Sequence, residues 1–204
     1  MSILREIFGP SKKEIWNELT SHIDAEFVEG GIFGKDKVVA HHGEWTITLD
    51  TYTVSTGKSS TTYTRMRAPY VNRDGFWFTI YRSGFFSEVG KLFGMKDIIV
   101  GYPEFDENFV IKGNYEDKVK ELFSNTHIRS LIEIQPRFHL EVKDDEGWFV
   151  TEFPEGVDEL SFRVVGIIKD IELLKALFDL FAEILNYLCE IGSAYETKPN
   201  VELN

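Results

Sequence analysis

The stretch "HHGEWTITLDTYTVSTGKSSTTYTRMRAPY", His41 to Tyr70, carries the strongest folding signal in the chain. Apolar and polar residues alternate on both sides of Gly57-Lys58, which is the pattern of two half-buried strands joined by a two-residue turn. A shift of one residue would move the side chains of one strand to the opposite face, so the pairing is well specified. The predicted facing pairs are Trp45–Tyr70, Ile47–Ala68 and Leu49–Met66 on an apolar side, and Asp50–Arg65 and Tyr52–Tyr63 on a polar side.

The next turn, Asn72-Arg73-Asp74-Gly75, has the composition of a type I turn followed by a left-handed glycine. It would fold a third strand back onto the second, and the same apolar face would continue across it. The sequence therefore predicts a three-stranded antiparallel meander with one apolar side and one polar side. The pairs that this turn predicts are Tyr70–Phe78, Ala68–Ile80 and Arg67–Tyr81.

Before this region, a helix is predicted from about Lys12 to Ile23. Ser11 and Glu14 have the spacing of a capping box, and the apolar residues that follow recur at helical intervals. The stretch "FVEGGIFGKDKVVAHH", residues 27–42, then predicts two short strands around a turn at Gly34–Lys37, because glycines and alternation replace the helical spacing.

The second half of the chain predicts alternating helices and strands. A short helix is expected from about Phe85 to Phe93, and a short strand at "DIIVGYP", residues 97–103. A hairpin should join "RFHLEVK" to "WFVTEF" through Asp144–Gly147, with Val142 facing Val150, and a third strand should follow it. The other expected elements are a strand over Phe109–Lys112, a helix over Tyr115–Ser124 and a helix over His127–Ile134.

A long helix is predicted from about Ile171 to Ile191, with Asp170 as its N-cap. Its polar residues form one narrow stripe on an apolar cylinder, so most of its circumference needs a cover. The cover is either the second half of the chain or a second copy of the protein in a homodimer. Five charges within the helix rule against a membrane span. The stripe consists of Glu172, Lys175, Asp179, Glu183, Asn186 and Glu190.

Composition limits the classes of function. The 204 residues are 43% hydrophobic, which is ample material for a core, and their net charge of −12 argues against nucleic-acid binding through phosphates. The acidic excess lies beyond residue 96, which suggests two modules with different surfaces, although acidity also simply keeps proteins soluble. The single cysteine cannot form an internal disulfide, and no positively charged start leads into an uninterrupted apolar run. Neither export nor a signal peptide is indicated, so we expect a cytoplasmic protein.

Together these patterns predict an α+β fold. We expect an antiparallel β-meander followed by a second antiparallel sheet packed on helices, with a long buried C-terminal helix. The expected division is a helix-plus-meander module over residues 1–102 and an α+β module over residues 103–204, with the alternative that both pack as one unit.

The candidate catalytic and ligand-binding motifs lack the residue spacing or the neighbouring helix or strand that their chemistry needs. "TGKSS" has Tyr52 where a phosphate-binding loop needs glycine, and a strand rather than a helix follows it. His41 and His42 are neighbours in a strand and point to opposite faces, so they cannot readily hold one metal ion. There is no Gly-x-Ser-x-Gly motif, and Cys189 lies in an apolar helix. We therefore predict no cofactor and no metal site.

The most suggestive surface is the polar face of the predicted meander. Tyrosine, tryptophan and arginine on a rigid sheet are enriched among residues that dominate binding energy. The alternative is that Asp50 and Arg65 pair with each other and that a helix covers the aromatic side chains. The candidate binding residues are Tyr52, Tyr63, Arg65, Arg67, Trp77 and Tyr81.

Two functional hypotheses follow. The first is a noncatalytic protein that binds a protein or small ligand through this exposed face, without nucleic acid. The second is a hydrolase with an acid–base or metal centre near His41 or His42, completed by acidic side chains of the second module. A pocket with a converging histidine and carboxylates would favour the enzyme, and a flat face with dispersed histidines would favour binding.

The stretch "FDENFVIKGNYEDKVKELFSNTHIRSLIEI", residues 105–134, together with "FHLEV" at 138–142, resembles a module of uncharacterised bacterial proteins. That module has a strand, two helices, a β-hairpin and a closing helix, and the resemblance covers about Phe105 to Leu188. The earlier stretch "WTITLDTYTVSTGKSSTTYTRMRAPY", residues 45–70, also resembles part of an uncharacterised bacterial family. Both motifs are structural, so the resemblance implies a bacterial protein but no activity and no site residue.

Overall fold

The computed structural model describes residues 10–31, 35–83, 95–144, 153–201 and 203. Its strands are β1 (Ala25–Val28), β2 (Lys37–His42), β3 (Trp45–Ser55), β4 (Ser60–Asn72), β5 (Phe78–Arg82), β6 (Phe109–Gly113), β7 (Phe138–Lys143), β8 (Val157–Val165) and β9 (Ala194–Tyr195). Its helices are α2 (Lys12–Leu19), α3 (Pro103–Asn108), α4 (Glu116–Leu122), α5 (Thr126–Glu133) and α6 (Ile171–Glu190). The predicted α+β class is confirmed.

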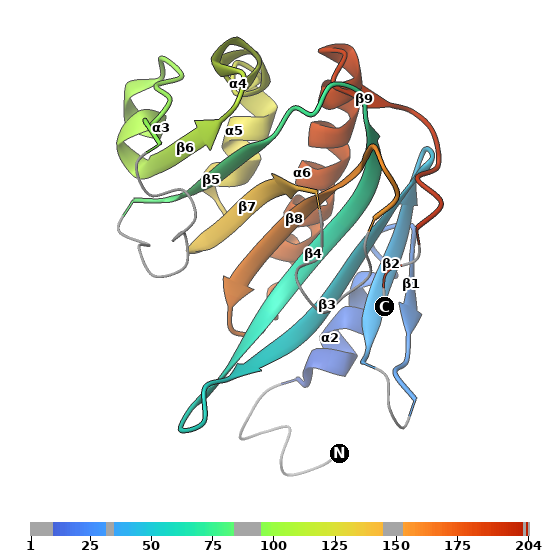
Figure 1. Ribbon diagram of the computed structural model, residues 1–204. Helices are drawn as coiled ribbons and strands as arrows, with labels where there is room; N and C mark the ends of the chain where they lie inside the picture. The colour runs from blue at the N-terminus through green and yellow to red at the C-terminus, as the bar shows by residue number, and fades with distance from the viewer. Residues whose placement is uncertain (1–9, 32–34, 84–94, 145–152, 202, 204) are drawn as a thin grey trace.

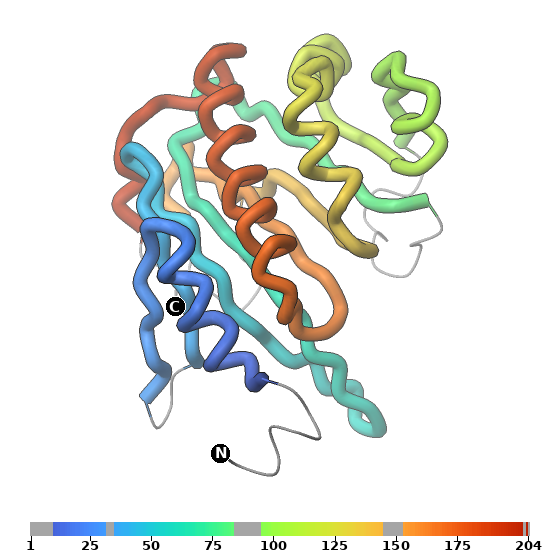
Figure 2. The backbone as a smooth tube through the Cα atoms, turned by 180° about the vertical axis from the view of Figure 1, so that it is seen from behind, coloured from blue at the N-terminus to red at the C-terminus, as the bar shows by residue number. Residues whose placement is uncertain are grey.

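The named strands form one sheet, in the order β1-β2-β3-β4-β8-β7-β5-β6, with β9 paired to β4. Each named pair of neighbouring strands is antiparallel. Helices α2, α5 and α6 lie on one face of this sheet, and no described helix lies over the other face of β3, β4 and β8 (Figures 1 and 2). Strands from both predicted modules therefore build a single sheet over one core.

The β3–β4 hairpin has the predicted register. The Thr56 N–H donates to the Ser59 carbonyl at 2.9 Å across the turn, and Gly57 has a φ of 77°, a left-handed conformation that favours glycine. Its tip projects beyond the neighbouring strands (Figure 1). The ladder includes the predicted pairs Leu49–Met66, Asp50–Arg65 and Tyr52–Tyr63, and it ends at Thr48–Arg67, before the predicted pairs Ile47–Ala68 and Trp45–Tyr70.

The predicted pairing of the second and third strands of the meander is wrong. Gly75 is left-handed, with a φ of 71°, but the turn does not close a hairpin. The Asn72 N–H donates to the carbonyl of Gly156, and the Arg73 N–H donates to the carbonyl of Ser193. The residues expected to face β5 instead face β8, in the pairs Arg67–Ser161, Ala68–Leu160 and Tyr70–Asp158, and β8 and β7 lie between β4 and β5.

Strand length gives the physical reason for this difference. β4 has 13 residues, whereas β5 has 5 and β8 has 9. Pairing with β8 satisfies more of the backbone N–H and C=O groups of β4 than β5 can reach, and unpaired buried groups are costly. The short β5 lies between β6 and β7 instead.

The long C-terminal helix is the central helix of the core. α6 begins after Asp170, whose side chain accepts a hydrogen bond from the Leu173 N–H at 3.0 Å, as an N-cap does. Four residues of its predicted polar stripe are exposed, and the remaining two are partly buried. Its apolar residues are buried within the chain, namely Leu174, Leu177, Phe178, Leu180, Phe181, Ile184, Leu185 and Leu188.

The N-terminal elements are present with shifted ends. Ser11 and Glu14 form the predicted capping box, and α2 ends at Leu19 rather than Ile23. The first two strands pair as predicted. The Trp16 indole N–H donates to the carbonyl of Ile168 at 3.2 Å, which fixes α2 to the segment after β8.

Three other predictions have different outcomes. Residues 97–102 form no strand, which corrects the expected strand there; α3 begins at Pro103. The predicted helix over residues 85–93 lies outside the described residues. Val150, the predicted partner of Val142, also lies outside them, and Val142 is paired with Leu160 of β8.

Candidate binding face

Strand pairing carries two rows of polar side chains across the sheet, on the face away from α6. Directly paired residues project to the same face, and successive residues of a strand alternate. Between these rows lies an apolar row that belongs to the core, Leu49–Met66–Phe162–Leu140–Ile80. The first polar row is Asp50–Arg65–Arg163–His139–Tyr81, and the second is Thr48–Arg67–Ser161–Glu141–Thr79.

Asp50 is the centre of a three-residue ion-pair cluster. Its Oδ1 accepts from Nε of Arg65 at 2.8 Å, and its Oδ2 accepts from Nη2 of Arg65 at 2.7 Å. The same Oδ2 accepts from Nη2 of Arg67 at 2.9 Å. A bidentate contact to a planar guanidinium fixes the orientation of both groups, so Arg65 is held in one position on the sheet.

The environment keeps Asp50 ionised. Burial alone would raise the pKa of this carboxyl, but the hydrogen bonds and positive charges of Arg65 and Arg67 outweigh it, so the pKa lies below its usual value. The side chain of Arg67 is only 1% exposed, whereas that of Arg65 is 21% exposed. Arg67 therefore belongs to the interior of the cluster, and Arg65 forms its open side.

Two tyrosines border the cluster. The rings of Tyr52 and Tyr63 are stacked, with centroids 5.0 Å apart and planes 12° from parallel. The guanidinium carbon of Arg65 lies 5.1 Å from the centroid of Tyr52, within the range of a cation–π contact. Tyr52 is partly exposed and Tyr63 is buried. The two rings and Arg65 form one packed unit on the polar face.

The structure separates the other two predicted site residues from this unit. Tyr81 lies in the same row as Arg65, but β8 and β7 stand between them, and its ring meets the edge of His139 with centroids 6.0 Å apart. Trp77 precedes β5 and packs against the core. The prediction that all six side chains gather on an exposed face is therefore corrected, because it relied on the β4–β5 pairing and because Tyr63, Arg67 and Tyr81 are buried.

His139 is a neutral histidine inside the polar face. Burial lowers its pKa to about 3, and the positive charges of Arg163 and Lys143 act in the same direction. Its Nε2 lies 2.7 Å from Oγ1 of Thr79, and its 3.6 Å approach to Glu141 is no ion pair at neutral pH. A histidine that stays neutral while buried is better suited to structure than to proton transfer.

β8 contributes two residues that the sequence analysis missed. Arg163 lies directly opposite Arg65, and Val165 follows on the same face with 53% of its surface exposed. The alternation of polar and apolar residues in β8 was visible, but nothing local indicated that β8 pairs with β4. We name Tyr52, Arg65, Arg163 and Val165, together with the buried Tyr63 that stacks on Tyr52, the Tyr–Arg patch.

The two adjacent histidines of β2 lie in separate environments. His41 pairs with Thr46, and its Nδ1 lies 3.3 Å from the hydroxyl of that residue. His42 pairs with Trp45, and its Nε2 lies 3.1 Å from Oδ1 of Asn186 in α6. Within the described ranges, no group of three His, Cys, Asp or Glu side chains is arranged to hold a metal ion. Each of the two histidines therefore contacts a different residue.

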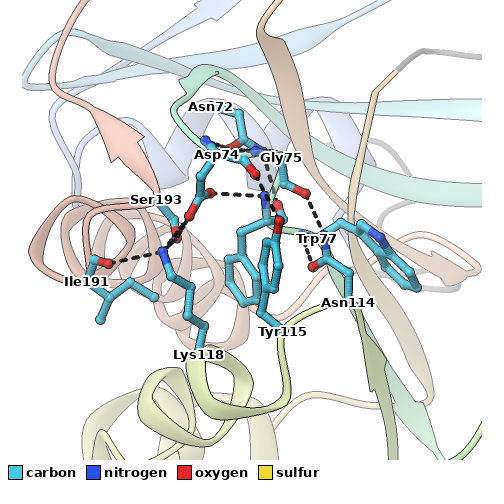
Figure 3. Close-up of polar contacts among 10 residues, drawn as sticks. Asn72, Asp74, Gly75, Trp77, Asn114, Tyr115, Lys118, Ile191 and Ser193 are labelled. Atoms are coloured by element: carbon cyan, nitrogen blue, oxygen red, sulfur yellow. Dashed lines mark hydrogen bonds and ion pairs between the residues drawn. The ribbon is translucent and has the colours of Figure 1, made fainter.

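A second polar cluster lies at the turn between β4 and β5 (Figure 3). Lys118 donates to Asp74, to the Ser193 hydroxyl at 2.7 Å and to the carbonyl of Ile191 at 3.3 Å. Ser193 is fully buried, so it is not placed to attack a substrate. The cluster joins the turn to α4 and to the C-terminal end of α6, and its geometry is that of a structural clamp.

Comparison of the chain with protein families, curated proteins and solved structures found no match. None of the helices in the described ranges has the length and apolar character needed to cross a membrane.

Proposed function

We propose that this protein is a noncatalytic binding protein and that the Tyr–Arg patch contacts a partner protein. The observation that carries the proposal is the partly exposed guanidinium of Arg65, which Asp50 holds at two points and which lies against the ring of Tyr52. An arginine and tyrosines fixed before binding lose little conformational entropy when a partner arrives. These residue types are also the ones that dominate protein interfaces.

The surroundings of Arg65 support the same function. Val165 adds an exposed apolar side chain beside a charged group, and a mixture of apolar, aromatic and arginine side chains is typical of interface centres. The patch lies on the sheet face over which no described helix passes (Figure 1). The proposal does not include nucleic acid, because the net charge of −12 opposes contact with phosphates.

The experiment compares proteins recovered from cells of the native host by three tagged versions of the full chain. Tyr52→Ala removes half of the stacked pair, and Arg65→Ala removes the partly exposed guanidinium while Arg67 still neutralises Asp50. Tyr195→Ala is the matched control, since Tyr195 is 47% exposed and also packs against an arginine, Arg73, at 5.5 Å. Each variant is first checked for a wild-type thermal unfolding curve.

We expect a partner that is recovered by the wild-type protein and by Tyr195→Ala, and that is lost with Tyr52→Ala and with Arg65→Ala. Removal of one interface hot spot costs about 2 kcal/mol or more, which weakens binding roughly thirtyfold. Equal recovery of every partner by all versions would refute the proposal.

Two further proposals concern location and assembly. We place the protein in the cytoplasm of a bacterium, which the single Cys189 supports because it leaves no internal disulfide. The homodimer predicted through α6 stays a prediction. Eight apolar residues of α6 are already buried within the chain, and the fully exposed residues of the helix all belong to the polar stripe.

A further inference from the structure

The outer end of β3 forms a free edge of the sheet that the described residues build. β2 pairs with β3 only as far as Leu49, although β3 continues to Ser55. In the part of the chain that the structure describes, no strand pairs with residues 53–55 on the side away from β4. Thr53, Val54 and Ser55 are exposed. A strand edge of this kind is a template for pairing with another chain.

The hydrogen-bond pattern shows which backbone groups this edge presents. Hydrogen-bonded and non-hydrogen-bonded pairs alternate along an antiparallel ladder, and Thr56 with Ser59 is a hydrogen-bonded pair. Two residues earlier, Val54 also points its backbone groups toward β4. The N–H and C=O groups of Thr53 and Ser55 therefore point away from β4, to the free edge.

A contact on the far side of the hairpin confirms this alternation. Thr62 faces Thr53, and its carbonyl accepts from the Gly166 N–H at 2.8 Å, away from β3. The two threonine hydroxyls lie 3.0 Å apart, as expected for a close, non-hydrogen-bonded pair.

The edge lacks the features that normally prevent strand pairing. Edge strands are usually protected by charged side chains, proline or a bulge. Residues 51–55 read Thr-Tyr-Thr-Val-Ser, with no charge and no proline, and their residue types favour β-structure. Val54 is 44% exposed at the centre of this segment. An uncharged edge with an exposed valine fits an occupant that is itself an uncharged strand.

We propose that this edge pairs antiparallel with the same edge of a second copy of the protein. With the two-fold axis at Val54, Thr53 of each copy faces Ser55 of the other, and their outward N–H and C=O groups form four hydrogen bonds. The two Val54 side chains then cover each other. The segment is uncharged, so self-pairing brings no like charges together. The pairing also covers the free edge of each copy, so no edge is left for a third copy and the assembly ends at a dimer.

Such a dimer would also affect the binding face. Strands related by a two-fold axis normal to the sheet keep equivalent faces on the same side, so both Tyr–Arg patches would lie on one continuous face. The pairing itself is independent of the proposed function, because it uses backbone groups that the patch does not.

The test compares the full chain with two lysine variants of the hairpin. Val54→Lys places two positive charges next to each other at the two-fold axis. Thr61→Lys is the matched control, because Thr61 faces Val54 across the hairpin and lies on the strand away from the axis. Light scattering after size-exclusion chromatography gives the mass from about 10 µM to about 1 mM, a range suited to a weak interface.

We expect the mass of the wild-type protein and of Thr61→Lys to rise with concentration from 23.6 kDa toward twice that value. Val54→Lys should weaken self-association about tenfold or more, because like charges directly opposite each other destabilise a strand pair. A wild-type chain that stays monomeric over the whole range would overturn the proposal, as would a dimer that Val54→Lys leaves unchanged.

Hydrogen exchange followed by NMR identifies the edge itself. The amide protons of Thr53 and Ser55 should exchange quickly in dilute protein and slowly at high concentration, whereas that of Val54 should be protected at both. A dimer in which Thr53 and Ser55 gain no protection forms through another surface and contradicts the proposed pairing.

Discussion

Replacement of Asp50 by asparagine tests whether the Asp50–Arg65–Arg67 cluster holds the polar face together. Asparagine keeps the shape of the side chain but removes the charge that both arginines contact at 2.7–2.9 Å. Loss of one partner from a buried ion pair costs about 3–5 kcal/mol. Arg65 is 21% exposed and can turn toward water, whereas Arg67 is 1% exposed and cannot. We therefore expect the free energy of unfolding to fall by about 3 kcal/mol, at the lower end of that range.

The pH dependence of this loss follows from the lowered pKa of Asp50. A carboxyl with a lower pKa in the folded state contributes stability that is fully present above its unfolded pKa of about 3.9. That contribution disappears as the pH falls through the folded pKa. The difference between the wild-type protein and Asp50→Asn should therefore be largest near neutral pH and should shrink below about pH 4.

Urea unfolding followed by tryptophan fluorescence measures both effects, at about pH 7 and at about pH 3.5. Asp97→Asn is the control, because Asp97 is 55% exposed, so water screens its pairing with Lys112 at 3.0 Å, and Lys112 keeps its hydrogen bond to the carbonyl of Met95. If Asp50→Asn costs no more than Asp97→Asn, or if its cost does not change with pH, the cluster does not have the role inferred here.

Two further predictions concern groups outside this cluster. Lys118→Met should lower the free energy of unfolding by about 1 kcal/mol in urea titrations, because Asp74 and Ser193 lose a charged hydrogen-bond partner; an unchanged midpoint would contradict the clamp. In NMR titrations the imidazole of His139 should keep its neutral chemical shifts from about pH 8 down to about pH 4.5, because burial holds its pKa at about 3; a midpoint near 6.5 would contradict its buried position.

Features determined by short-range chemistry were predictable from the sequence. The turn at Gly57 fixed the register of β3 and β4, because each facing pair had to match in burial and charge. The cap residues Ser11 and Asp170 marked the starts of α2 and α6 for a similar reason, since an unpaired N–H at a helix start needs a side-chain acceptor. The pairing of Asp50 with Arg65 in the candidate site came from the same reasoning.

Features that depend on distant strands were not predictable in this way. β8 follows β4 by more than 80 residues, and no local signal distinguishes it from the nearer β5 as the neighbour of β4. The turn at Asn72–Gly75 has the composition of a hairpin turn, but the N–H groups of Asn72 and Arg73 donate to the carbonyls of Gly156 and Ser193. The pairing of β4 with β8 places Arg163 beside Arg65, and it also separates Tyr81 from the patch.

The ion-pair cluster also supplies information on register that the apolar pattern lacks. A slip of one residue between β3 and β4 would turn Leu49 toward the polar face, so hydrophobic burial alone excludes it. A slip of two residues keeps every side chain on its own face, and burial does not distinguish it from the observed register. Such a slip would place Asp50 opposite Tyr63 or Arg67 instead of Arg65 and would break the bidentate contact. We infer that the charges, together with the turn at Gly57, select the register among the alternatives that the apolar residues leave open, which gives a physical reason for a buried Asp50 and Arg67 in this hairpin.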